Sequence, residues 1–338
     1  MKYLKAKTIS SALLAFSMNT AIAAGSSGTE PLTQSFLNAL EQGGGTPMEQ
    51  LTPNNARQVL VNAQQGHPLL PADVSKTTIK IEDQSLALVV VKPKNASGAL
   101  PAFMYFHGGG WVIGDFETHE RLIRDLVIRS GAAAVYVDYS RSPEAKYPTA
   151  INQAYAATKW VAENGKTMGI DGNRLAVAGN SAGGNIATVV SLMAKEKGTP
   201  NLQMQLLLWP VTDASFDNTS YQAYGAGHFL TTGMMKWFWD SYTTDQHQRN
   251  EIYASPLRAT TEQLKGLPPT LIQTAEKDVL RDEAEYYGRK LSAAGVPTTV
   301  TRYNGMIHDF GLLNPLSDVN AVQNALDQAA LALNKHLF

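Results

Sequence analysis

The sequence has no cysteine in its 338 residues. This absence excludes disulfide bonds, a thiol nucleophile, thiolate metal ligands and a lipid attached through cysteine. It also means that export into an oxidising compartment would pose no problem of disulfide pairing. Any nucleophile or metal ligand in this chain must therefore be another kind of side chain.

Runs of charge of one sign are missing as well. The chain carries 28 Lys and Arg against 29 Asp and Glu, a formal net charge of -1, and no stretch of five or more like charges. This balance gives no indication of a nucleic-acid partner or of a polybasic contact with a membrane. With 44% hydrophobic and 17% charged residues, the composition is that of a soluble globular protein with room for a large core.

Apolar runs long enough to span a bilayer are also missing at the N-terminus, although a targeting pattern is present. Lys2, Lys5 and Lys7 precede a short apolar stretch that serines and an asparagine interrupt and that ends in Ala21-Ile22-Ala23. This order of basic, apolar and small-x-small residues is typical of a secretory signal peptide. We therefore predict a signal peptide over residues 1–23, cleaved near Ala23, and export to the periplasm or the medium without stable membrane insertion. An amphipathic helix or a retained anchor is the alternative.

The region from Thr77 onward alternates between strands and helices. The β-rich runs are TTIKI, LALVVVKP, PAFMYFH, AAAVYVDY, RLAVAGN, MQLLLWP, PTLIQTAE and TTVTRY. Helix-length segments between the later runs include Thr118 to Ser130, Thr149 to Asn164, Gly184 to Lys197 and Arg281 to Ala294. Continuous apolar strands that alternate with helices predict a mostly parallel sheet covered on both faces. The first two runs have no helix between them and are expected to pair antiparallel.

Two segments depart from this alternation. A helical stretch around Pro31 to Leu40 precedes the first strand, and Asp213 to Ser255 is rich in aromatic residues without a strand-like run. The second segment is either a helical crossover or an inserted cap over a site. Because it is long for a crossover, we favour the cap.

A serine stands in a strand-to-helix turn. Gly179-Asn180-Ser181-Ala182-Gly183 follows the run RLAVAGN and opens a helix, which is the context that a nucleophile elbow requires. Small neighbours are needed because the sharp turn forces the serine into a strained conformation. The alternative is a tight glycine turn with a helix-capping serine. We take Ser181 as the candidate nucleophile.

A serine nucleophile needs a base, and His308 is the best candidate. It follows the last strand-like run, on a loop at the carboxyl edge of the sheet, where sites form in open α/β sheets. The acid is expected between Ser181 and His308 in sequence. Asp278 fits best, because it lies just beyond the strand PTLIQTA, and Glu276 and Asp282 are its competitors.

The stretch FHGGGWVIGD, Phe106 to Asp115, ends another strand at the same edge. It matches neither G-x-G-x-x-G nor the P-loop pattern, because Ile113 stands where the third glycine would be and no Lys-Ser or Lys-Thr follows. Beside a serine elbow, an H-G-G-G loop instead supplies backbone N–H groups to the oxyanion of a tetrahedral intermediate.

Taken together, these motifs resemble the bacterial hormone-sensitive-lipase-like esterases of the α/β-hydrolase superfamily. The resemblance extends roughly from Pro68 to the C-terminus. The matching stretches, in family order, are HGGGW (107–111), DYSRSPE (138–144), GNSAGGN (179–185), SPLRA (255–259), DVLRDE (278–283) and GMIHDF (305–310).

The resemblance implies a role for each site residue. Ser181 would be the nucleophile, His308 the base and then the acid, and Asp278 the group that orients the imidazole. The oxyanion would be bound by the backbone N–H groups of Gly109, Gly110 and Ala182. No metal or cofactor is implied.

The resemblance also implies an α/β-hydrolase fold with a helical cap, in a single domain over residues 24–338. The cap would comprise about Pro31–Leu70 and Asp213–Tyr253. Two departures from the family pattern stand out: Asn180, where one large subgroup has aspartate and another threonine, and DYSRSPE in place of the more usual D-Y-R-L-A-P-E.

The expected function is hydrolysis of small carboxylic esters with short to medium acyl chains, through an acyl-enzyme intermediate. An amidase or peptidase on the same triad is the nearest alternative. A binding protein on an inactive hydrolase fold is the alternative from another class.

Overall fold

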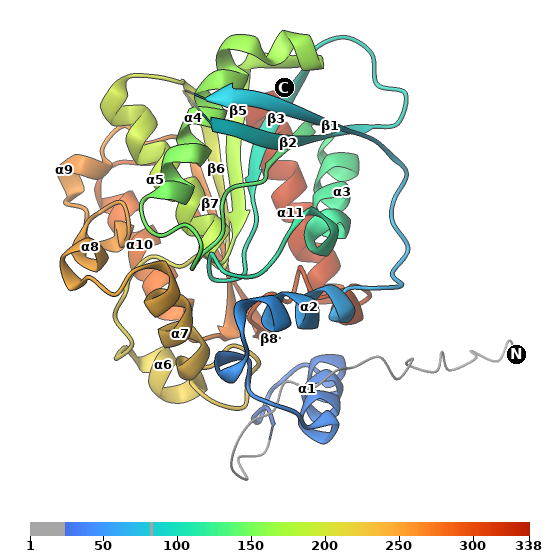
Figure 1. Ribbon diagram of the computed structural model, residues 1–338, viewed down its shortest axis with the longest axis vertical. Coiled ribbons are helices and arrows are strands. Elements are labelled where there is room, and N and C mark those ends of the chain that lie inside the picture. Colours follow the sequence, from blue (N-terminus) through green and yellow to red (C-terminus); the bar gives the residue numbers. More distant parts are fainter. Residues whose placement is uncertain (1–23, 82–83) are drawn as a thin grey trace, which may run out of the picture.

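The computed structural model describes residues 24–81 and 84–338 (Figure 1). The signal peptide that we predict over residues 1–23 lies outside these residues and stays a prediction. Within the described part of the chain, no helix combines the length and the apolar character needed to cross a membrane.

The eight β-rich runs form one sheet with strand order β1-β2-β4-β3-β5-β6-β7-β8. The two N-terminal strands are antiparallel to their neighbours and the other pairs are parallel, as the sequence predicts. The strands are β1 (Ala72–Ile81), β2 (Gln84–Pro93), β3 (Leu100–Phe106), β4 (Ala133–Val137), β5 (Ile170–Asn180), β6 (Leu202–Leu208), β7 (Thr270–Lys277) and β8 (Thr298–Ile307).

Helices cover both faces of this sheet. Figure 1 shows α3 (Phe116–Ser130) and α11 (Asn320–Leu337) on one side and α4 (Thr149–Asn164), α5 (Ala182–Lys197) and α10 (Arg281–Ala293) on the other. The central strands are buried on both faces; in β4 every residue is buried. This explains their continuous apolar sequences.

Helix α3 begins two residues before the predicted Thr118, because the sequence places a capping box there. The Asp115 carboxylate accepts the Thr118 N–H at 2.8 Å, and the Thr118 hydroxyl accepts the Asp115 N–H at 2.9 Å. The helix ends at Ser130 and is capped by Gly131, whose φ of 77° is left-handed and favours glycine.

The order of the strands places a crevice at the carboxyl ends of β3 and β5. From β3 the chain passes through α3 to β4 on one side, and it then crosses to β5 on the other side of β3. Such a reversal is the topological switch point at which open α/β sheets bind ligands. The HGGG loop follows β3 and the serine elbow follows β5, so both motifs lie at this point.

Two helical segments that are far apart in sequence gather near this end of the sheet (Figure 1). The first contains α1 (Pro31–Gly43), the 3-10 turn η1 (Met48–Gln50) and α2 (Pro53–Ala63), and the second contains α6 (Thr219–Tyr224), α7 (Thr232–Tyr242) and α8 (Gln246–Asn250). The segments touch through the rings of Phe36 and Phe229, whose centroids are 6.1 Å apart. The described residues also contain the short helix α9 (Thr261–Leu264) and the turns η2 (Gly165–Met168), η3 (Pro256–Arg258) and η4 (Asn314–Leu316).

Candidate active site

Ser181 stands between β5 and α5 in a strained conformation, with φ 53° and ψ −122°. Its N–H donates to the carbonyl of Leu208 at 2.9 Å, which holds the turn against the neighbouring strand. A side chain at either flanking glycine would clash: a Cβ on Gly179 would lie 2.3 Å from the carbonyl oxygen of Gly183, and one on Gly183 would lie 2.0 Å from that of Phe106. The G-x-S-x-G pattern is therefore required by the turn itself.

Ser181, His308 and Asp278 form a continuous row of hydrogen bonds. The distance from His308 Nε2 to Ser181 Oγ is 2.9 Å, and that from His308 Nδ1 to Asp278 Oδ2 is 2.7 Å. The other oxygen of Asp278 accepts the Leu280 N–H at 2.9 Å. With Nδ1–H donating to the carboxylate, Nε2 is left to accept the serine proton.

The charge around His308 favours its protonated form. Burial lowers the pKa of His308, but the negative charges of Asp278 and Asp309 and the hydrogen bond that His308 donates to Asp278 outweigh burial, so that the pKa lies above its usual value. The imidazole is therefore a stronger base than a free histidine.

The two competing carboxylates are used elsewhere. Glu276 accepts the Gly305 N–H at 2.6 Å. Asp282 pairs with Arg281 at 2.7 Å and accepts the Ser220 N–H at 2.9 Å. The structure thus brings Asp278, rather than Glu276 or Asp282, to the imidazole.

Gly109 and Gly110 line the same cavity as Ser181. Both have left-handed φ values, 100° and 59°. A Cβ on Gly109 would lie 2.4 Å from the carbonyl oxygen of Ile113, and one on Gly110 would lie 2.1 Å from the ring of Phe238. Ala182 is the first residue of α5, where a backbone N–H has no acceptor within the helix. The backbone N–H groups of Gly109, Gly110 and Ala182, which the resemblance implies as oxyanion donors, therefore belong to residues that line the cavity of Ser181 or directly follow this serine.

Asn180 links the elbow to the HGGG loop, a contact that sequence reasoning missed. Its Oδ1 accepts the Gly108 N–H at 3.0 Å and the Tyr105 hydroxyl at 2.9 Å. Its Nδ2 donates to Asp309 Oδ1 at 2.9 Å, and Trp209 Nε1 donates to the same oxygen at 2.6 Å. The unusual amide at position 180 was the only sequence signal of this network.

His119 of α3 also supports the loop. Its Nε2 accepts the Gly108 N–H at 3.2 Å. Burial lowers the pKa of His119, so the ring is neutral and can accept this bond at Nε2. The H-G-G-G backbone is thus fixed by side chains from β5 and α3.

The cavity at Ser181 is small and mainly apolar. Its open volume is about 30 Å³, which leaves little more than the space of one water molecule. Both helical segments contribute to its wall. The lining residues are Met48, Leu60, Gly109, Gly110, Ile113, Ser181, Phe229, Leu230, Met234, Phe238, His308, Asp309 and Leu312.

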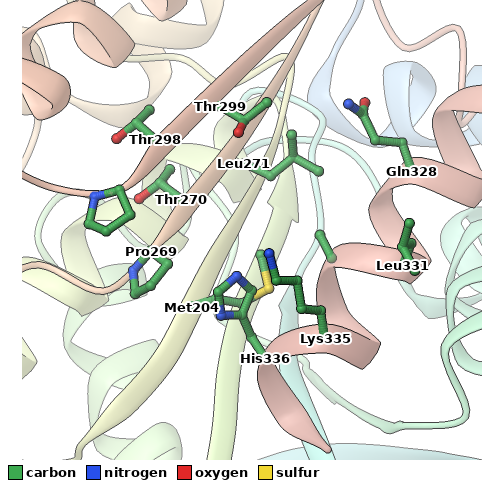
Figure 2. Close-up of a pocket in the computed structure, with 12 residues that line it drawn as sticks. Met204, Pro269, Thr270, Leu271, Thr298, Thr299, Gln328, Leu331, Lys335 and His336 are labelled. Carbon is green, nitrogen blue, oxygen red and sulfur yellow. The ribbon is translucent and has the colours of Figure 1, made fainter.

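A larger hollow of about 540 Å³ lies at the amino ends of β7 and β8, the opposite ends of the strands from Ser181 (Figure 2). Thr270 and Thr298, the first residues of β7 and β8, line it together with Leu331 and Lys335 of α11. It is remote from Ser181, so cavity size alone does not identify the site. Among the described residues, no cluster of three or more acidic or histidine side chains could hold a metal ion.

Comparison with known proteins agrees with this geometry. Residues 103–312 match a family model described as the α/β hydrolase fold. A solved thermostable esterase from Pseudomonas putida ECU1011 is 66% identical, with a TM-score of 0.92 over 93% of this chain and 99% of that chain. The ethyl acetate hydrolase of Pseudomonas putida is 31% identical over 300 residues, 86% of this chain and 92% of that protein. Carboxylesterase NlhH of Mycobacterium tuberculosis is 36% identical over 242 residues, 70% and 74% of the two chains. The chain therefore belongs to the hormone-sensitive-lipase-like carboxylesterases of the α/β-hydrolase superfamily.

Proposed function

We propose that this esterase cleaves carboxylic esters through an acyl-enzyme intermediate on Ser181. The observation that supports this most directly is the hydrogen-bonded row from Ser181 through His308 to Asp278. A serine hydroxyl is a poor nucleophile unless a base removes its proton, and this row supplies the base and the group that orients it.

In the first step, His308 Nε2 takes the Ser181 proton while Oγ attacks the ester carbonyl. The carbonyl oxygen becomes an oxyanion, which the N–H groups of Gly109, Gly110 and Ala182 stabilise. The imidazolium then gives its proton to the departing alcohol. In the second step, His308 activates a water molecule, which releases the acid and restores Ser181.

We further propose that the acyl group is short to medium in length. The small cavity beside Ser181 is closed by apolar side chains of η1, α2 and α7, among them Met234 and Phe238. A longer chain would require these side chains to move. The name of the ethyl acetate hydrolase, one of the relatives, agrees with a short acyl group.

We also propose that residues 1–23 direct export and are removed near Ala23. Ala24, the next residue, is buried, and its carbonyl accepts a hydrogen bond from the Gln34 side chain at 2.6 Å. The folded unit can therefore begin at Ala24. N-terminal sequencing of the protein from a periplasmic or culture-medium fraction should start near this residue, whereas an intact Met1 in that fraction would contradict cleavage.

The proposed function is tested with p-nitrophenyl acetate, butyrate, octanoate and palmitate. We expect fast turnover of the two short esters and slow turnover of palmitate. Ser181→Ala should reduce kcat by about 10^4-fold or more. Ser97→Ala, an exposed serine in the turn after β2, is the matched control and should retain full activity. If Ser181→Ala retained turnover, or if amides were cleaved faster than esters, the proposal would be wrong.

A further inference from the structure

A second carboxylate lies beside the imidazole, on the side opposite Asp278. Asp309 directly follows His308 in the chain, is 8% exposed and lines the same cavity as Ser181. Its Oδ2 is 3.7 Å from His308 Nε2. This distance is too long for a hydrogen bond but short enough for a strong charge interaction in a buried site.

The position of Asp309 is fixed by several groups. Its Oδ1 accepts hydrogen bonds from Trp209 Nε1 at 2.6 Å and from Asn180 Nδ2 at 2.9 Å. Its carbonyl accepts the Leu312 and Leu313 N–H groups at 2.8 and 2.9 Å. Its φ of 58° is left-handed, a conformation that costs free energy in a residue other than glycine and persists only when the surroundings enforce it.

The ionisable groups around these residues leave the two aspartates as the main charges. Asp309 faces Tyr105 of β3 and His119 of α3, and burial favours the neutral form of both by raising the pKa of the tyrosine and lowering that of the histidine. The positive charge of Arg121 of α3 also acts on Tyr105, but Arg121 is paired with Asp125 at 2.6 Å. Around Asp278 lie Tyr221 of α6 and Glu283 of α10, and burial raises the pKa of each.

We propose that Asp309 is a positioning residue that stabilises the His308 imidazolium from the Nε2 side, while Asp278 stabilises it from the Nδ1 side. This inference rests on the proposed role of His308 as the base. Asp309 does not itself accept the serine proton, because Ser181 Oγ already occupies the hydrogen-bonding position at Nε2. Its carboxylate acts by charge alone on the cation that forms in each step.

The same arrangement explains the unusual Asn180. The Asn180 amide donates to Asp309, so an aspartate at position 180 would bring two carboxylates to about hydrogen-bond distance of each other, which is strongly unfavourable. The neutral amide and the carboxylate thus form a matched pair.

The first variant is Asp309→Asn, which keeps an oxygen to accept from Trp209 and Asn180 but removes the charge. Loss of a nearby negative charge lowers the pKa of His308, so the ascending limb of kcat/KM against pH should move to lower pH by roughly one unit. The plateau of kcat should fall about three- to tenfold because the imidazolium is less stabilised, with KM nearly unchanged. Asp309→Ser, which is smaller and neutral, is the second variant if the first folds poorly, and the same shift is expected.

The second experiment is Trp209→Phe, which removes the indole N–H that donates to Asp309 Oδ1 but keeps the carboxylate. We expect the thermal midpoint to fall while the ascending limb stays at the pH of the parent, because the charge beside His308 remains. If Asp309 acted only through its hydrogen bonds, the limb would move in Trp209→Phe as it does in Asp309→Asn, and the inference would be wrong.

The inference is wrong if the limb of folded Asp309→Asn or Asp309→Ser lies within about 0.2 pH units of the parent. Failure of the proposed function would give a different result. If the proposed function were wrong, Ser181→Ala would retain the activity of the parent, whatever the behaviour of the variants at Asp309.

Discussion

Ser181 combines a strained backbone with a buried hydrogen-bonded base. The strained conformation at φ 53° costs on the order of 1–3 kcal/mol. The hydrogen bond to Leu208 of the neighbouring strand holds this conformation, and the flanking glycines leave the space that it needs. In return, Oγ stands clear of α5 and faces His308 Nε2. The conformation therefore serves the reaction and not the stability of the fold.

The role of Asp278 is tested by Asp278→Asn. The amide is nearly isosteric, but it removes the charge and can present an N–H to Nδ1, which favours the wrong tautomer of His308. We expect kcat to fall by about 10^2- to 10^4-fold. Because Asp278 contributes the larger of the two carboxylate effects on the pKa of His308, the residual activity should have its ascending limb at lower pH than the parent. Full activity in this variant would redirect the assignment to Glu276.

Sequence reasoning identifies Ser181, Asp278 and His308 because each directly follows a strand at one edge of the sheet. It misses the role of Asp309, although this residue is adjacent to His308. The partner Trp209 is 100 residues away along the chain, and only the folded backbone brings its indole N–H to the carboxylate. Side-chain networks of this kind depend on distances that no local pattern contains.

At the scale of elements, the site consists of loops that a rigid sheet holds at its switch point. Helix α2 is attached to two of these loops by one side chain. Arg57 donates to the carbonyl of Val112 at 2.8 Å, to that of Ser142 at 3.0 Å and to both oxygens of Glu144. Hydrogen bonding from Arg57 lowers the pKa of Glu144 to about 2. The glutamate of the DYSRSPE motif thus helps to fix the wall of the site.

Helix α7 sets the size of the acyl pocket in this account, and Phe238→Ala tests this. The ring is 3% exposed, lines the cavity and packs against Gly110. Its removal should raise the ratio of octanoate to butyrate turnover by about tenfold or more, and should destabilise the protein by about 3–5 kcal/mol. Lys236→Ala, at an exposed position of the same helix and outside the cavity lining, is the control and should leave the ratio unchanged. Equal ratios of octanoate to butyrate turnover in the two variants would contradict the claim that α7 sets the size of the acyl pocket.

The sequence predicts the strands well because the central ones are continuous apolar runs bounded by turn residues. It does not identify α2, and it places the starts of α3 and α5 two residues late. For α3 the reason is the Asp115 capping box, and for α5 it is that the helix begins directly after the strained serine. Helix α2 does carry local signals, since Thr52 accepts the Asn55 N–H as its cap and Pro53 is its first residue, and the contact of Arg57 with Glu144, 87 residues away, adds to them.

At the scale of the whole molecule, one continuous core joins the sheet to the helical segments around the site. Leu37 of α1, Met48 of η1 and Phe238 of α7 belong to the same buried cluster as Leu206 of β6. The helical segments that form the cap can be distinguished from the hydrolase domain in the sequence. In the structure, however, apolar packing is continuous between the two.

This continuity predicts one cooperative unfolding transition. Intrinsic fluorescence, to which Trp237 and Trp239 of α7 contribute together with the other three tryptophans, should change with urea in one step. Its midpoint should equal that of the far-ultraviolet circular dichroism of the whole fold and that of the loss of esterase activity. If activity and fluorescence were lost at clearly lower urea than circular dichroism, the helical segments would unfold as a separate unit, contrary to this account.

The most direct test of the central claim is mass spectrometry after reaction with a fluorophosphonate, which phosphonylates activated serines. The account predicts one adduct per chain, located on Ser181 by peptide mapping, with loss of activity in proportion to labelling. Labelling should be absent in Ser181→Ala and strongly slowed in His308→Ala. An adduct on another serine, or full labelling without loss of activity, would contradict the assignment of Ser181 as the nucleophile.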